Sequence, residues 1–286
     1  MASLSFTEDA FLDAASREED FTNLGTDGFE LGAESYLRNF YADALENEFL
    51  DYNLDDLILL ARDFWMMGNR RLPSESLVCV KSSPVMTDAS LSDTIVQVVC
   101  DDMSFIVDSL VAAVSSLGIN VSGLFHPIVD GFRDGDGKWS TAGVEVSESM
   151  ILLLIAPQSE RSQKRLEEEI RKTLVEVKII NDDFLPLVQN VRMRAEELKH
   201  AHGKTPKDDV DEGVAFLEWL ADGNFVLFGA RRYDYTQSAT SATADFDYIN
   251  PTVVEGDSLG LLRDPSVTIL RQSSEPSSIS TNVERF

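Results

Sequence analysis

Apolar residues recur every three or four positions in two early runs, Tyr36 to Leu45 and Leu57 to Trp65. This spacing places the apolar side chains on one face of a helix. Asn53 can cap the second helix, and Arg70 and Arg71 suit the negative end of its dipole. We therefore predict a helical hairpin near the N-terminus.

A different pattern begins at Thr94, where apolar residues occupy both faces of the predicted strands. Thr94 to Cys100 is apolar except for Gln97, and Met150 to Ile155 is apolar throughout. Strands with this composition are covered on both sides. Between these two strands, an apolar stripe at helical spacing predicts a helix over residues 104–117, which ends at Gly118. A strand over 119–129 and a glycine turn over 133–137 follow, and the last strand covers 149–156.

Two further helices are expected after the last strand, one from Ser159 to Val177 and one from Asp182 to His200. The order strand, helix, strand, strand, helix is typical of the ferredoxin-like βαββαβ sandwich, so we predict an α+β fold with helices on one face of the sheet. Because the strands are apolar on both sides, the second face requires cover from another copy, another domain or the N-terminal hairpin.

Changes in composition divide the chain into an acidic arm, the hairpin with a lead-in strand at Glu75 to Lys81, the sandwich with its C-terminal helix, and a second α+β segment that is incomplete at its C-terminus: residues 1–33, 34–85, 86–202 and 203–286. The last segment follows a polar hinge. Its pattern predicts a helix over Val210 to Ala221 and a strand over Phe225 to Phe228.

The charge balance narrows the choice of partners. The chain has 50 acidic and 24 basic residues, a net charge of −26. Neutralising phosphates requires clustered Lys and Arg, so we expect no nucleic-acid partner. The sequence has neither a secretory signal nor an apolar run long enough to span a membrane. Cys79 and Cys100 are too few for a disulfide framework, so the prediction is a cytoplasmic chain with reduced thiols and no membrane partner.

The acidic turn after the first central strand is the best candidate for a ligand site. Asp101 and Asp102, followed by Met103 and Ser104, could receive a cationic amino group or a metal. The competing interpretation is that Asp102 or Ser104 caps the next helix. We place the remaining effector-binding candidates, Gly118 and Asn120, opposite this turn, with Gly118 also expected as a left-handed C-cap.

No residues combine into a complete catalytic, cofactor-binding or metal site. His126 and Asp130 could in principle serve a hydrolase or metalloenzyme, but a single histidine beside Pro127 is more typical of a structural residue. His200 and His202 are surrounded by lysines, which disfavours a metal. The run from Asp134 to Gly137 departs from the calcium-loop spacing of EF-hands, and a hairpin turn explains it better.

Five segments resemble, in order, the N-terminal region of the large bacterial NAD-dependent glutamate dehydrogenases. They are YLRNFYADALENEFLDYNLDDLILLARDFW (36–65), VVCDDMSFIVDSL (98–110), GLFHPI (123–128), RDGDGK (133–138) and FLEWLADGNFVLFGARRYDY (216–235). The resemblance implies a fragment of an oxidoreductase that deaminates L-glutamate to 2-oxoglutarate and ammonia with NAD, whose catalytic and NAD-binding domain lies downstream. No cofactor is expected in the fragment itself.

Residues 94–180 resemble an ACT domain, a fold that binds amino acids at interfaces in other proteins. Ligand-binding ACT domains have a proline-glycine pair where Met103 and Ser104 stand here. The segment after residue 210 resembles the start of a PAS-like domain.

These observations favour a non-catalytic regulatory and oligomerisation module, with allosteric control of the enzyme as its role. Its expected partners are the downstream domains of the same chain, further copies of itself and an amino-acid effector. The alternative is an independent ACT-type amino-acid sensor that acts on a separate partner.

Overall fold

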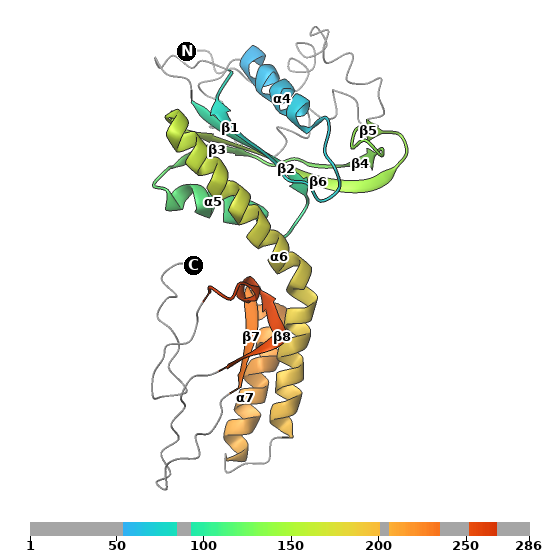
Figure 1. Ribbon diagram of the computed structural model, residues 1–286, viewed down its shortest axis with the longest axis vertical. Coiled ribbons are helices and arrows are strands. Elements are labelled where there is room, and N and C mark those ends of the chain that lie inside the picture. The colour runs from blue at the N-terminus through green and yellow to red at the C-terminus, as the bar shows by residue number, and fades with distance from the viewer. Residues whose placement is uncertain (1–53, 85–92, 201–205, 235–251, 268–286) are drawn as a thin grey trace. The chain divides into compact units, whose positions relative to one another are not determined.

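The computed structural model describes residues 54–84, 93–200, 206–234 and 252–267 (Figure 1). The chain divides into two compact units, residues 1–177 and 178–286. The predicted acidic arm, the first helix of the hairpin and the Asn53 cap lie outside the described residues. None of the described helices is both long enough and apolar enough to cross a membrane.

The first unit is built on an antiparallel sheet in the strand order β1-β2-β6-β4-β5, with β3 also paired to β6. Its elements are α4 (Leu54–Gly68), β1 (Leu77–Ser82), β2 (Thr94–Asp101), α5 (Ile106–Ser116), β3 (Val121–Phe125), β4 (Ile128–Arg133), β5 (Trp139–Ser140), β6 (Val144–Ile155) and the first half of α6 (Glu160–Lys199). The unit is therefore α+β, as predicted.

The predicted strand over residues 119–129 is in fact two strands, β3 and β4, which pair with successive parts of β6. The break falls at His126 and Pro127, because proline has no backbone N–H to give to the ladder. The Pro127 carbonyl instead accepts a hydrogen bond from the Met150 N–H at 3.0 Å. The glycine turn is confirmed, since Asp134 and Lys138 close the loop between β4 and β5.

The edge strand next to β2 comes from a different part of the chain than the βαββαβ order predicts. That order supplies a final strand after the second helix, whereas the strand beside β2 is β1, which precedes it in the chain. Val78 and Val80 of β1 lie in the same buried cluster as Val96 and Val98 of β2. The lead-in strand thus fills this edge and pairs with the backbone groups of β2, which is buried along almost its whole length.

Helices cover both faces of the sheet. On one face, α4 packs its Leu57, Leu60 and Phe64 against Ile95 and Val99 of β2 and against alternate residues of β6. The prediction that the second face is covered is confirmed, and the cover comes from the second helix of the hairpin. Figure 1 shows α4 on the side of the sheet opposite α5.

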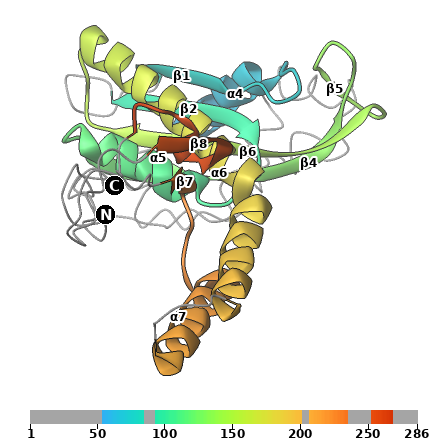
Figure 2. The ribbon, with the colours of Figure 1, turned by 60° about the horizontal axis from the view of Figure 1, so that its bottom comes forward.

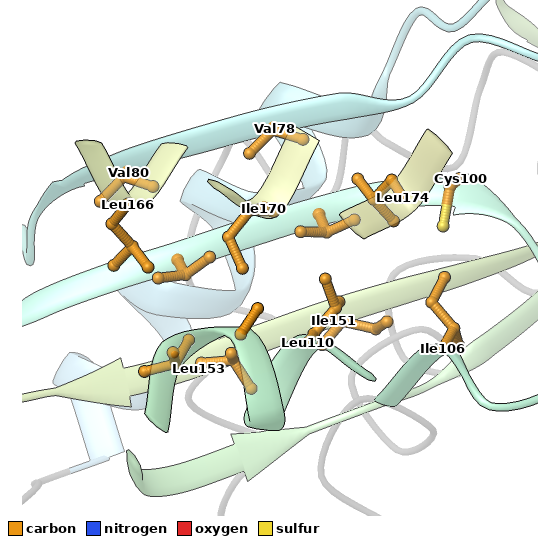
Figure 3. Close-up of a cluster of buried hydrophobic side chains, with 14 of the residues drawn as sticks. Val78, Val80, Cys100, Ile106, Leu110, Ile151, Leu153, Leu166, Ile170 and Leu174 are labelled. Atoms are coloured by element: carbon orange, nitrogen blue, oxygen red, sulfur yellow. The ribbon is translucent and has the colours of Figure 1, made fainter. Parts of the chain in front are cut away.

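The other face is covered by α5 and the first half of α6. Figure 3 shows Ile106 and Leu110 of α5, and Leu166, Ile170 and Leu174 of α6, directed toward the strands. Val96, Val98 and Cys100 of β2 and Ile151, Leu153 and Ile155 of β6 complete this cluster. Each fully buried aliphatic side chain of this size contributes about 1.5–3 kcal/mol, so two separate apolar layers hold the unit together.

The predicted cap is absent at the N-terminal end of α5 and present at its C-terminal end. Neither Asp102 nor Ser104 takes the N-cap position, which belongs to Phe105 (φ 66°) and carries no side-chain hydrogen bond. Asp102 instead accepts a hydrogen bond from the Ser149 hydroxyl. The left-handed C-cap at Gly118 is confirmed by φ 74° and by the hydrogen bond from the Ile119 N–H to the Val114 carbonyl.

The second unit contains the rest of α6, α7 (Lys207–Trp219), a π-helical turn (Leu220–Asn224), β7 (Gly229–Asp234), β8 (Thr252–Gly260) and a short 3₁₀ turn (Leu261–Arg263). Figures 1 and 2 show α7 alongside the second half of α6. An ion pair from Lys199 to Glu218 joins α6 to α7, and one from Arg192 to Asp222 joins α6 to the π-helical turn that follows α7. The described part is α+β, and the PAS-like identification stays a prediction.

Two predictions for this unit are wrong. The two helices expected over 159–177 and 182–200 are one helix, α6, because residues 178–181 contain no glycine or proline that would end the first of them. An ion pair from Lys178 to Asp182 spans that stretch. The strand expected over Phe225 to Phe228 begins only at Gly229, and both phenylalanines are exposed.

Asp183 fastens the β7–β8 sheet to α6. Its carboxylate is buried and accepts hydrogen bonds from the Gly260 N–H at 2.7 Å and from Arg263 Nε at 2.6 Å. The Arg263 hydrogen bond holds the pKa of Asp183 below its usual value despite burial. This carboxylate is therefore a charged structural link.

Candidate functional site

The acidic turn after β2 is engaged by neighbouring side chains. The Asp101 carboxylate accepts a hydrogen bond from Arg71 Nη2 at 2.5 Å, and Arg71 is 1% exposed. Arg71 also donates through Nη1 to the Glu75 carbonyl at 2.6 Å and through Nε to Glu148 at 2.9 Å. Burial works against the charge of Arg71, but the hydrogen bond to Asp101 and the charge of Glu148 outweigh it and raise the pKa of Arg71.

Glu148 is the centre of this charged cluster. Its carboxylate is fully buried and receives Arg133 through Nε at 2.6 Å and Nη2 at 2.7 Å, a bidentate pair. Arg133 also donates to the Gly137 carbonyl at 2.6 Å and to the Gly68 carbonyl, the end of α4, at 2.8 Å. Two arginines and two carboxylates thus balance in charge, with their polar atoms already bonded to one another and to backbone.

Two tryptophans complete the surroundings of this cluster. The Arg133 guanidinium lies 4.1 Å from the ring centroid of Trp139, a cation–π contact. Trp139 in turn stacks on Trp65 of α4 with centroids 6.3 Å apart. The Arg71, Arg133, Glu148 and Asp101 cluster therefore ties α4, the β4–β5 turn and β6 together, which is a structural role.

A second hydrogen-bonded chain joins Asp102, Ser149 and His126. Ser149 Oγ donates to Asp102 Oδ1 at 2.7 Å and lies 2.9 Å from His126 Nε2. The serine has a single proton, which it gives to Asp102, so His126 Nε2 is the donor in its contact with Ser149. A serine nucleophile requires the histidine between serine and carboxylate. The order found here does not activate Ser149, and it gives no support to a hydrolase.

Sequence reasoning missed Arg71, Arg133, Glu148 and Ser149 as a group. Arg71 was expected at the end of the second helix, yet α4 ends at Gly68 and its last carbonyl is capped by Arg133. One signal was available: Glu148 falls in the same alternating phase of β6 as Val146, Met150 and Leu152, which face α4. A carboxylate in an apolar phase predicts a buried partner.

The six effector candidates do not form one site. Met103 packs against the cluster beneath α5, whereas Ser104 is exposed beside Asp102. Gly118 and Asn120 lie beyond the other end of α5, whose 11 residues span about 16 Å at the usual rise. The structure thus separates the acidic turn from Gly118 and Asn120.

Gly118 and Asn120 belong instead to a cavity of about 330 Å³ at the far end of the sheet. Its walls come from the turn after α5, the turn after β6 and the first turns of α6: Leu117, Gly118, Ile119, Asn120, Ala156, Gln158, Ser162 and Arg165. The Gln158 N–H donates to Thr94 Oγ1 at 2.9 Å, which fixes the middle wall to the start of β2.

The other candidate ligands have structural partners. Asp134 Oδ1 accepts the N–H groups of Asp136 and Lys138, both at 2.9 Å, as expected for a turn residue. His200, in the turn after α6, contacts Glu196 of that helix at 3.1 Å, and His202 lies outside the described residues. No cluster of three His, Cys, Asp or Glu side chains with the geometry of a metal site occurs in the part of the chain that the structure describes.

Comparisons with known proteins agree with the sequence resemblance. Residues 36–174 match the family model of the glutamate dehydrogenase ACT1 domain. The NAD-specific glutamate dehydrogenase of Halomonas elongata is 25% identical over 211 residues, which are 70% of this chain and 13% of the relative. That of Pseudomonas aeruginosa is 28% identical over 162 residues, 54% of this chain and 10% of the relative. The aligned part is thus a small fraction of each relative.

Proposed function

We propose, from the match of residues 36–174 to the family model of the glutamate dehydrogenase ACT1 domain, that the chain is a non-catalytic regulatory and assembly module of an NAD-dependent glutamate dehydrogenase. The whole enzyme would oxidise L-glutamate to 2-oxoglutarate and ammonia in the cytoplasm, with NAD bound by a domain outside this chain. The family match is the observation that carries the proposal.

The chemistry of the first unit supports a module without catalysis. The buried arginines and carboxylates are paired with each other, and Ser149 gives its proton to Asp102. General acid-base catalysis needs a group free to exchange protons with a substrate. The residues of this cluster serve to hold elements together.

A longer polypeptide tests the enzymatic part of the proposal. We expect NAD reduction with glutamate from the whole gene product and none from the 286-residue chain. Activity in the short chain would contradict a non-catalytic module. Absence of activity in the whole product would contradict the assignment to a glutamate dehydrogenase.

The second candidate function is an independent amino-acid sensor. The observation that favours it is the cavity of about 330 Å³, which has room for a small molecule. The two candidates differ in the coding sequence downstream of the domain: a dehydrogenase domain in the same reading frame supports the enzyme module, and a nearby stop codon supports the sensor. Isothermal titration with a panel of amino acids tests regulation in both cases, since absence of heat with all of them leaves only an assembly role.

Assembly is the second part of the proposed role. We propose that the whole enzyme is a homo-oligomer in which this module contacts other copies or the downstream domains, and that the segment after residue 210 begins a PAS-like domain. Because α4 already covers the second face of the sheet, the contact would use other surfaces. Light scattering of the whole enzyme, with and without residues 1–286, measures the contribution of the module to the oligomer.

A further inference from the structure

The cavity at the far end of the sheet has a cationic wall. Arg165 lines it, and Arg161 and Lys164 belong to the same first turns of α6, where Glu160 is the only acidic residue among residues 160–165. Three basic residues in five positions stand out in a chain with 50 acidic and 24 basic residues. Residues 161–165 are therefore basic in a chain that is acidic as a whole.

Arg165 has no partner in the part of the chain that the structure describes, although Glu168 and Glu169 follow it at helical spacing. Other basic residues of α6 do form such pairs, including Arg171 with Glu167 and Lys172 with Glu176. A guanidinium offers five N–H donors in a planar fork that matches a carboxylate or phosphate. Arg165 is thus available to an anion in the cavity.

The rest of the lining adds polar and apolar groups. The Asn120 amide and the Ser162 hydroxyl make no hydrogen bond with described residues and can donate to the same anion. The N-terminal turn of α6 adds the positive end of the helix dipole. Leu117, Ile119 and Ala156 provide an apolar wall for a short carbon chain.

We infer that this cavity binds a small organic anion, whose carboxylate or phosphate group lies against Arg165, Ser162 and Asn120 and whose short aliphatic part lies against Leu117 and Ile119. The site lies at the opposite end of α5 from the acidic turn. It goes beyond the proposed function, because binding here requires neither the enzyme nor an amino group on the ligand.

Isothermal titration of the 286-residue chain with sodium succinate and with sodium phosphate, at constant ionic strength, tests the site. We expect saturable binding of at least one probe and about a tenfold loss of affinity in Arg165→Gln, the effect of removing a charge-assisted hydrogen bond. Tighter succinate binding identifies a carboxylate ligand, and tighter phosphate binding identifies a phosphate ligand.

Arg161→Gln is the matched control, because Arg161 lies one helical turn away and has the same charge but does not line the cavity. It should bind the probe as the unaltered chain does. The inference is overturned if the chain binds neither anion, or if Arg161→Gln and Arg165→Gln have equal effects. These results do not depend on glutamate oxidation, so the proposed function stands or fails separately.

Discussion

The two ends of the sheet in the first unit differ in how their charges are used. At the Asp101 end, Arg71 and Arg133 are 1% and 3% exposed and are saturated by Glu148, Asp101 and backbone carbonyls. At the Gly118 end, Arg165 is exposed, lines a cavity and has no partner among the described residues. The same residue type thus serves cohesion where its donors are satisfied and is available for recognition where they are not.

We call the Asp101 end of the sheet, where the arginines are buried and paired, the closed end, and the Gly118 end the open end. The largest effect is expected from removing the negative charge of Glu148 at the closed end. Glu148→Gln leaves two buried guanidinium groups with one charged partner fewer, which should lower the free energy of unfolding by about 3–5 kcal/mol. Urea unfolding of the 286-residue chain measures it. Glu145→Gln, an exposed change in the same strand, should cost little, and equal losses in the two variants would show that Glu148 is not central to the cluster.

A smaller effect is expected at the turn that holds this cluster. Gly137 has φ 80°, and a Cβ there would lie 2.5 Å from the Arg71 carbonyl oxygen. Gly137→Ala should therefore destabilise the chain by about 2–3 kcal/mol through strain and collision. In Gly135→Ala, two residues earlier, the added methyl meets nothing within 4 Å. The prediction fails if the thermal melts of these two variants coincide.

The closed end should also show a pH dependence from Cys100. Burial raises the pKa of this thiol from 9.0 to about 12. Between these values the unfolded chain ionises the thiol and the folded chain does not, so this contribution to stability is intact below pH 9 and falls as the pH rises, by about 1.4 kcal/mol per pH unit. Unfolding at pH 8 to 10 should be less steeply pH-dependent in Cys100→Ala, and parallel slopes would contradict the prediction.

The smallest effect is expected at the open end. Gly118 has φ 74°, but a Cβ there meets nothing within 4 Å. Gly118→Ala should cost about 1 kcal/mol, the strain of a left-handed residue alone. Urea unfolding gives the loss in free energy of unfolding for each variant. The difference between the Gly137→Ala loss and the Gly118→Ala loss is the part that comes from close packing around Gly137. A larger loss in Gly118→Ala would reverse the contrast between the two ends.

Much of the first unit was predictable because it rests on local signals. The apolar stripe predicted α5, its end at Gly118 followed from C-cap chemistry, and the Asp134 turn followed from the Asp-Gly pairs. The two-sided apolar pattern of β2 correctly required a cover on each face. These features depend on residues within one or two turns of each other.

The charged cluster and the edge strand could not be predicted in the same way. Arg71 and Glu148 are 77 positions apart, and neither the pairing of β1 with β2 nor the meeting of Gly118 with Arg165 leaves a periodic signal. The break expected between residues 177 and 182 is also absent, since α6 runs without interruption from Glu160 to Lys199. Long-range pairing of polar groups is decided by tertiary packing, which a single sequence does not display.

The position of β1 has a consequence for synthesis on the ribosome. Every strand of the main sheet lies between Leu77 and Ile155, and the helix that covers the second face, α4, precedes them all. A chain emerging from its N-terminus therefore needs only residues up to the first half of α6 to bury both apolar layers. In the βαββαβ order, the last strand of the sheet would follow α6, so the edge of β2 would stay unpaired until that strand had been synthesised. Unpaired edges promote aggregation of nascent chains.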